Sequence, residues 1–184
     1  MTSEIVVRPA TAADAASVAA IYNHYIRETV VTFEETEVPS SEIARRMRDL
    51  ESASLPWLVA ERDSTIVGYA YAVKWHSRSA YRYSLETTVY VDVDHKRTGV
   101  GSRLYDRLLP ILEARGFHAV MAGISLPNEG GVALHEAFGF SKAAHFTEVG
   151  FKLNRWVDVG SWERTLSPRE PRAARAVKTS GTPG

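Results

Sequence analysis

Cysteine is absent from this chain of 184 residues, and so is an excess of charge of either sign. Without cysteine the protein can form no disulfide framework, no thiolate zinc site and no cysteine nucleophile. An acyl-transfer reaction in this chain therefore cannot pass through an acyl-cysteine. The 22 basic residues balance the 22 acidic ones, so no general field favours nucleic acid or a membrane surface as a partner. We expect a small, specific ligand instead.

Long apolar runs and clustered metal ligands are missing too. No stretch reaches the run of about 18 apolar residues that a membrane-spanning helix needs. The first residues lack the charged start and apolar run of an export signal, so the expected location is the cytoplasm. We predict no metal site, because the histidines that could contribute to one show no close metal-ligand spacing: His24, His76, His95, His118 and His145.

The apolar content of 45% is enough for one globular domain with a sizeable core, which we expect to span residues 4–166. Residues 167–184 have few large apolar side chains and several prolines, glycines and arginines, which predicts a disordered tail. Patterns typical of strands and helices alternate along the domain, which predicts an α/β (α+β) fold with a central mixed β-sheet flanked by helices. Strands are expected at 4–8, 57–61, 66–75, 85–93, 118–124, 146–153 and 156–163, and helices after Thr11, from Ser40 or Ser41, from Ser102 and at 132–138.

The segment 85–104 organises this pattern, because it joins a predicted strand to a helix through a short basic loop. Gly99 and Gly101 in that loop lack Cβ, so the backbone can turn sharply and let a ligand approach. The backbone amides from Arg97 to Ser102 are expected to be free donors at the start of the helix, where an anion can bind. The alternative is a plain strand-to-helix turn.

One segment, 28–39, has no helical period and carries an apolar cluster at Val30, Val31 and Phe33. Such a cluster either fills the core or lines a pocket, and the usual behaviour of buried apolar loop residues favours the core.

Two motifs resemble those of the Gcn5-related N-acetyltransferase (GNAT) superfamily. The first is Lys96-Arg97-Thr98-Gly99-Val100-Gly101, which is similar to the pattern Gln/Arg-x-x-Gly-x-Gly/Ala after a strand, although lysine replaces the commoner first residue. The second, after the fifth strand, comprises Asn128, Gly131, His135, Gly139 and Phe140, with His135 where many relatives keep a tyrosine acid.

A closer resemblance runs through nearly the whole expected domain and includes IYNHYI, PWLVAE, RTGVGSRLY, LHEAFGF and WVDVG. These segments are similar to those of phosphinothricin N-acetyltransferases. The resemblance implies direct transfer of acetyl from acetyl-CoA to the α-amino group of phosphinothricin or a related amino-acid analogue such as methionine sulfoximine. It also implies a homodimer, in which Phe33 closes the pocket of its own or of the neighbouring subunit.

The resemblance also implies the binding residues. Acetyl-CoA is expected along the central strand, in the glycine loop and at the fifth-strand motif, at Val89, Tyr90, Val91, Arg97, Thr98, Gly99, Val100, Gly101, Ser102 and Asn128. The acceptor is expected to contact Phe33, His76, Ser77, Arg78, Tyr81, Tyr83, Glu86, Thr87 and Thr88. Arg78, with Arg82 beside it, supplies the fork-shaped donors that a carboxylate or phosphinate favours. An ordinary exposed loop arginine is the alternative.

Glu86 and His135 are the candidate catalytic residues. An α-amino group with a pKa of about 8 is largely protonated at neutral pH, so a base has to take its proton. In the resembling family the glutamate that matches Glu86 is the proposed base, and the alternative is a structural ion pair with Arg82 or Lys74. His135 either shares the base role or protonates the leaving thiolate, and the alternative is a semi-buried structural histidine.

Two other functions remain open from the sequence. The same fold can acetylate a different amine, either another amino acid or a protein N-terminus, and a peptide acceptor needs an open groove. A non-catalytic acyl-CoA sensor keeps the anion cradle and loses the base, whereas this sequence carries both Glu86 and His135.

Overall fold

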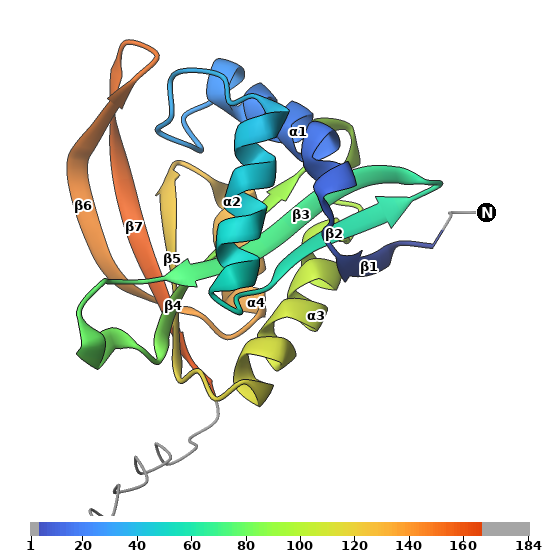
Figure 1. Ribbon diagram of the computed structural model, residues 1–184. Coiled ribbons are helices and arrows are strands. Elements are labelled where there is room, and N and C mark those ends of the chain that lie inside the picture. The colour runs from blue at the N-terminus through green and yellow to red at the C-terminus, as the bar shows by residue number, and fades with distance from the viewer. Residues whose placement is uncertain (1–3, 167–184) are drawn as a thin grey trace, which may run out of the picture.

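The computed structural model describes residues 4–166, and the tail predicted at 167–184 lies outside these residues. A seven-stranded sheet has the order β1-β2-β3-β4-β5-β7-β6 (Figure 1). Its strands are β1 (Val6–Pro9), β2 (Trp57–Arg62), β3 (Thr65–Lys74), β4 (Ser84–Val91), β5 (Ala119–Leu126), β6 (Ser141–Lys152) and β7 (Arg155–Thr165). Only the pairing of β4 with β5 is parallel, so the sheet is mixed, as predicted.

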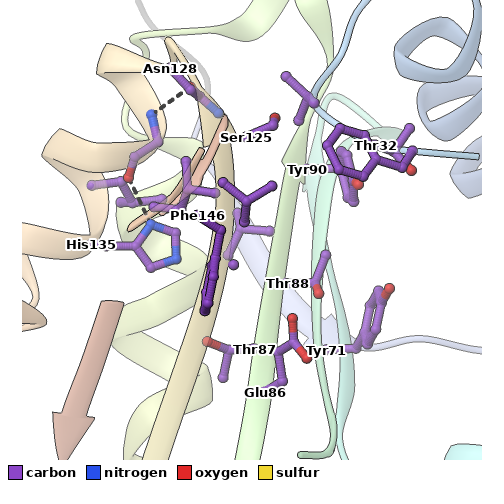
Figure 2. A pocket seen from close by; sticks show the side chains of 18 of the residues that line it. Thr32, Tyr71, Glu86, Thr87, Thr88, Tyr90, Ser125, Asn128, His135 and Phe146 are labelled. Carbon is purple, nitrogen blue, oxygen red and sulfur yellow. Dashed lines mark hydrogen bonds between the residues drawn. The ribbon is translucent and has the colours of Figure 1, made fainter. Parts of the chain in front are cut away.

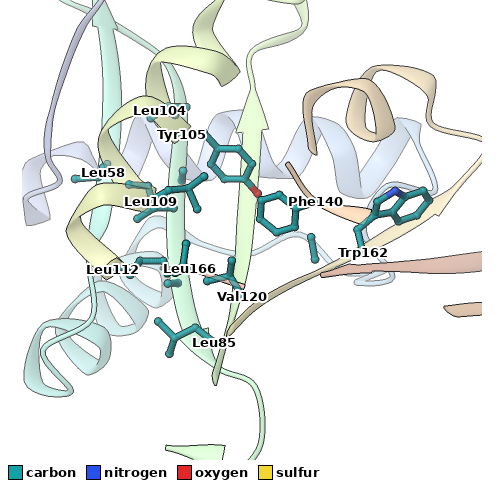
Figure 3. Packing of buried hydrophobic residues seen from close by; sticks show 14 of the residues in the cluster. Leu58, Leu85, Leu104, Tyr105, Leu109, Leu112, Val120, Phe140, Trp162 and Leu166 are labelled. Carbon is teal, nitrogen blue, oxygen red and sulfur yellow. The ribbon is translucent and has the colours of Figure 1, made fainter. Parts of the chain in front are cut away.

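Four α-helices cover the two faces of this sheet: α1 (Ala15–Glu28), α2 (Ser40–Ser52), α3 (Val100–Ala114) and α4 (Glu129–Ala137). Alternate residues of each strand enter different cores, because successive side chains point to opposite faces. Trp57 and Val59 belong to the cluster with α1 and α2, whereas Leu58 and Ala60 belong to the cluster with α3. Figure 3 shows the second cluster, with Leu104 and Leu112 of α3 among the sheet side chains.

Several predicted boundaries were wrong in detail. Neither Ser40 nor Ser41 caps α2, since the helix already includes both and Pro39 is its N-cap. Helix α4 starts three residues earlier than predicted, because the Asn128 side chain accepts a hydrogen bond from the Gly131 amide at 2.9 Å and caps it. Strand β6 begins at Ser141 instead of residue 146: it is an edge strand, and its mostly exposed first residues carry no alternating pattern.

The sheet opens between β4 and β5. Their parallel ladder pairs only Ser84, Leu85 and Glu86 of β4 with residues 119–121 of β5. Beyond Glu86 both strands continue, β4 to Val91 and β5 to Leu126, without further pairing to each other. The backbone edge of β4 after Glu86 is therefore left to other partners.

Candidate active site

Two adjoining cavities occupy the opening between β4 and β5. We call the first the strand cavity: it has a volume of about 530 Å³ and its walls include residues 86–90 of β4 and 123–125 of β5. The second, the cradle cavity, has a volume of about 730 Å³ and lies at the N-terminal ends of α3 and α4. Both cavities are lined by Val89, Tyr90, Asn128 and Leu134, among others, so an extended ligand can occupy the two together.

Glu86 lines the strand cavity at the point where the ladder ends. It shares one face of β4 with Thr88, which lies opposite Tyr71 of β3 (Figure 2). Burial raises the pKa of the Glu86 carboxyl, while the charge of His76 and the backbone of Gly123 act in the other direction. Within residues 4–166 no ion pair reaches Glu86, so the alternative of a structural ion pair with Arg82 or Lys74 was wrong.

His135 approaches the same cavity from the opposite face of the sheet. Thr87 follows Glu86 and points the other way, and its hydroxyl lies 3.0 Å from that of Tyr105 on α3. The Tyr105 hydroxyl in turn lies 2.7 Å from Nε2 of His135 on α4. Figure 2 accordingly shows Glu86 and His135 on different sides of the opening. Glu86 is thus one candidate proton-transfer group, and its neighbour Thr87 connects to the other, His135, through the Tyr105 hydroxyl.

The hydrogen bonds of His135 settle its tautomer. The Nδ1 atom lies 2.7 Å from the Gly131 carbonyl, which can only accept, so Nδ1 carries the proton and donates it. In the neutral ring Nε2 is then an acceptor, and the Tyr105 hydroxyl donates to it. Burial lowers the pKa of His135, which favours this neutral form. Both ring nitrogens are therefore engaged by the protein itself.

The loop that was predicted to hold an anion forms the start of α3. Gly99 is its N-cap with φ 84°, a left-handed conformation that favours glycine. A Cβ on Gly101 would lie 2.9 Å from a terminal methyl group of Leu134 on α4, so a larger residue there would have to displace the Leu134 side chain. The amides of the first turn of α3 have no partner within the helix, and Gly99 to Ser102 line the cradle cavity. An anion is favoured at this positive end.

Basic side chains border this cradle. Arg97 lines the cradle cavity, and so does Lys96, the residue that departs from the superfamily pattern. The Lys96 ammonium lies 5.0 Å from the ring centroid of Tyr25, at the end of the cavity where α1 ends. Thr98 does not line the cavity, because its hydroxyl donates to the His95 carbonyl at 2.7 Å.

The apolar segment after α1 both fills the core and lines the cavity. Val30 is buried, whereas Val31, Thr32 and Phe33 form part of the wall of the strand cavity. Phe33 does so for its own subunit. Neither of the two alternatives drawn from the sequence therefore describes the whole segment.

The loop between β3 and β4 does not reach either cavity wall. Five of the residues expected to contact an acceptor lie in it, namely His76, Ser77, Arg78, Tyr81 and Tyr83. Its aromatic rings pack on one another instead, with 5.1 Å between the ring centroids of Trp75 and Tyr81. The loop leads directly into Ser84, the first residue of β4 and two residues before Glu86. Acceptor binding by the loop stays a prediction.

Sequence reasoning missed Tyr71 and Ser125, which both line the strand cavity. Tyr71 lies in a strand whose alternation was recognised, but the pattern gives no indication of which face meets the cavity. The Ser125 hydroxyl is buried and has no hydrogen-bond partner among the described residues, so it is available to a ligand. No local signal marks it.

Together these features suit an extended ligand with an anionic end. A strand edge without a partner can pair with a chain that carries amides, and the helix start can hold phosphate groups. At the other end Glu86, with a raised pKa, is placed to take a proton. Within the described residues no cluster of three or more metal-ligating side chains occurs, and no helix is long and apolar enough to cross a membrane.

Known proteins are similar to this chain in sequence and fold. The family model described as the acetyltransferase (GNAT) domain matches residues 7–160. A phosphinothricin N-acetyltransferase from Streptomyces viridochromogenes is 45% identical over 175 residues, which cover 93% of each chain. An L-methionine sulfoximine/L-methionine sulfone acetyltransferase from Salmonella typhimurium is 32% identical over 83% of this chain and 90% of its own.

A solved structure agrees with these comparisons. The crystal structure of a GNAT superfamily phosphinothricin acetyltransferase from Sinorhizobium meliloti, in complex with AcCoA, superposes with a TM-score of 0.88. The two chains are 30% identical, and the match covers 96% of this chain and 97% of the other.

Proposed function

The chain belongs to the GNAT acetyltransferase family, and we propose that it transfers acetyl directly from acetyl-CoA to the α-amino group of phosphinothricin or a related amino-acid analogue such as methionine sulfoximine. The observation that carries the proposal is the opening after Glu86, which joins a partly buried carboxylate to the proposed anion cradle. The names of the relatives supply the substrate class.

The residues present fit acetyl-CoA. The edge of β4 at Val89, Tyr90 and Val91 is not paired with β5 and offers backbone groups to the amides of the pantetheine arm, although the Val91 carbonyl already accepts from the Tyr25 hydroxyl. The first turn of α3, with Arg97 and Lys96 beside it, provides donors and charge for the pyrophosphate. The thioester of acetyl-CoA supplies the acetyl group. A strand amide near Tyr90 is then placed to stabilise negative charge on the thioester oxygen.

We assign the base role to Glu86. Its raised pKa makes it a better base than an exposed carboxylate, and it lies on the side of the opening that Thr88 and Tyr71 share. His135 is proposed to share the base role through the Tyr105 hydroxyl, which donates to Nε2, because in this tautomer Nε2 carries no proton to give to the leaving thiolate. Arg78 and Arg82 remain the proposed partners for the anionic groups of the acceptor.

The two rival functions make different demands on the site. A sensor would not need a carboxylate with a raised pKa in the cavity, and Glu86 is one. A GNAT enzyme for another amine would keep every feature described, so only the acceptor distinguishes it.

An assay of thiol release from acetyl-CoA tests the proposal. Phosphinothricin, methionine sulfoximine, ordinary amino acids and a short peptide are compared by kcat/KM. A preference of at least about tenfold for the first two is expected, since that ratio corresponds to about 1.4 kcal/mol of transition-state binding. Activity on none of them, with acetyl-CoA still bound, would contradict the proposed substrate and favour another amine or the sensor.

We further propose that the protein is a homodimer that uses the β6–β7 hairpin. The edge strand β6 and its neighbour carry large exposed apolar side chains, namely Phe146, Val149, Phe151, Leu153 and Trp156. A monomer rarely exposes so many together. Phe146 and Val149 also line the strand cavity, so a second copy on this hairpin would help to close the site.

A cytoplasmic location of the protein stays a prediction.

Trp156→Glu is expected to convert the dimer to a monomer, because Trp156 is 60% exposed and a charge there cannot be buried against a second copy without cost. Light scattering after size-exclusion chromatography measures the mass. Val6→Glu, at the opposite edge of the sheet, is the control and should stay dimeric. A monomeric unchanged protein, or a dimeric Trp156→Glu variant, would refute this interface.

A further inference from the structure

Lys152, at the end of β6, is a buried cation that the proposed reaction does not use. The residue is 3% exposed, and no ion pair within residues 4–166 includes it. Burial lowers the pKa of its ammonium, while the nearby charges of Glu35 and Glu34 raise it. A lysine is rarely buried without partners that satisfy its donors. The groups that accept hydrogen bonds from the Lys152 ammonium therefore indicate its role.

The ammonium donates hydrogen bonds to backbone carbonyls instead of carboxylates. Nζ lies 2.7 Å from the carbonyl oxygen of Thr32 and 3.5 Å from that of Tyr25. Tyr25 lies in the last turn of α1, where carbonyls without helical partners attract a cation. Thr32 belongs to the wall of the strand cavity. Lys152 thus ties β6 to the end of α1 and to this wall.

A second contact joins the same strand to the same wall. The ring of Phe33 lies so close to the backbone of Gly150 that a Cβ there would be 2.3 Å from it. Gly150 is two residues before Lys152, so the Phe33 ring packs on the face of β6 from which the Lys152 side chain extends. The segment 31–33 is therefore held on β6 by an ammonium at Thr32 and by ring packing at Phe33.

We propose that Lys152 is a positioning residue that fixes the 31–33 wall of the strand cavity and thereby sets the affinity for the acyl acceptor. Thr32 and Phe33 line the strand cavity and not the cradle cavity, whereas Val31 lines both and Tyr25 lines the cradle cavity. Because the shorter hydrogen bond of the ammonium is to Thr32, its loss should affect the acceptor more than acetyl-CoA. This inference rests on the proposed acetyl transfer for its kinetic consequence.

Lys152→Met tests the proposal, because methionine keeps an unbranched stem and removes the charge. Replacement of a buried charge by an apolar side chain of similar size is often neutral or stabilising, so the variant should fold. The KM for the acceptor is expected to rise about tenfold or more, since a hydrogen bond to a charged group is lost. The kcat and the KM for acetyl-CoA should stay within about twofold of those of the unchanged protein.

Two further variants sharpen this result. Lys152→Arg keeps a cation with several donors and is expected to restore most of the acceptor affinity. Lys142→Met removes an exposed lysine from the same strand and should leave all kinetic constants unchanged. If Lys152→Met does not fold, Lys152→Gln is measured in the same way.

Amide hydrogen exchange of residues 29–34 provides a readout that does not depend on activity. Exchange should be faster in Lys152→Met and unchanged in Lys142→Met, because only the first releases the wall. Equal changes in both KM values and kcat, or unchanged exchange, would overturn the proposal. An unchanged protein without acceptor turnover would instead refute the proposed function, and hydrogen exchange would then decide the role of Lys152.

Discussion

Replacing Glu86 by glutamine is expected to lower kcat about 100-fold to 10,000-fold, the usual contribution of a positioned general base. Glutamine keeps the shape of the side chain but cannot accept the proton of the acceptor's ammonium group. Glu86 is itself the last residue of β4 that pairs with β5. Its backbone should therefore stay in place in the variant. The loss should therefore be in chemistry and not in folding.

The affinity for acetyl-CoA is the internal check on this variant. Glu86 lines the strand cavity but not the cradle cavity, so the dissociation constant of acetyl-CoA should change little. Glu163→Gln, an exposed position on β7, serves as the matched control and should keep full turnover. Unchanged turnover in Glu86→Gln would remove Glu86 from the proposed mechanism.

The pH dependence of kcat/KM gives the same test a second form. Glu86 acts as a base only when ionised, and burial raises its pKa above the ordinary 4.5. Activity should therefore be present above this raised pKa and be lost as the pH falls through it. The acidic limb should lie above pH 4.5 in the unchanged protein, and Glu86→Gln should remove it. An identical limb in both proteins would assign it to another group.

Gly101→Val is expected to weaken acetyl-CoA binding strongly. A Cβ at this position would lie 2.9 Å from a terminal methyl group of Leu134, so the larger valine has to displace that side chain or push α3 away from α4. Either movement changes the cradle cavity, which Gly101 and Leu134 both line. Overpacking of this kind costs about 1–3 kcal/mol, which predicts a rise of about 5-fold to 150-fold in the KM for acetyl-CoA.

The acceptor and the fold provide the controls for Gly101→Val. At saturating acetyl-CoA the acceptor KM should change much less, because Gly101 does not line the strand cavity. Asp106→Ala, an exposed position further along α3, should leave both KM values unchanged. Circular dichroism at the assay temperature shows whether the variant is folded. A folded Gly101→Val with normal acetyl-CoA affinity would contradict the cradle.

Local features of this protein could be predicted because they depend on neighbours in the sequence. The alternation after Leu85, the glycines at 99 and 101 and the helical period that follows place a strand, a turn and a helix start in order. The resemblance to acetyltransferases, and not a local pattern, singled out Glu86 as the base, and this role stays a prediction. The resemblance to acetyltransferases was confirmed by the family model and the relatives.

Long-range geometry was decided by the tertiary structure alone. An alternating pattern shows which side chains share a face, but not what that face meets, so it could not place Glu86 and His135 on opposite sides of the opening. The engagement of both nitrogens of His135 depends on Tyr105, 30 residues away in the sequence. Lys152 reaches Thr32 across 120 residues. Such contacts depend on how the elements pack in space, which no local pattern records.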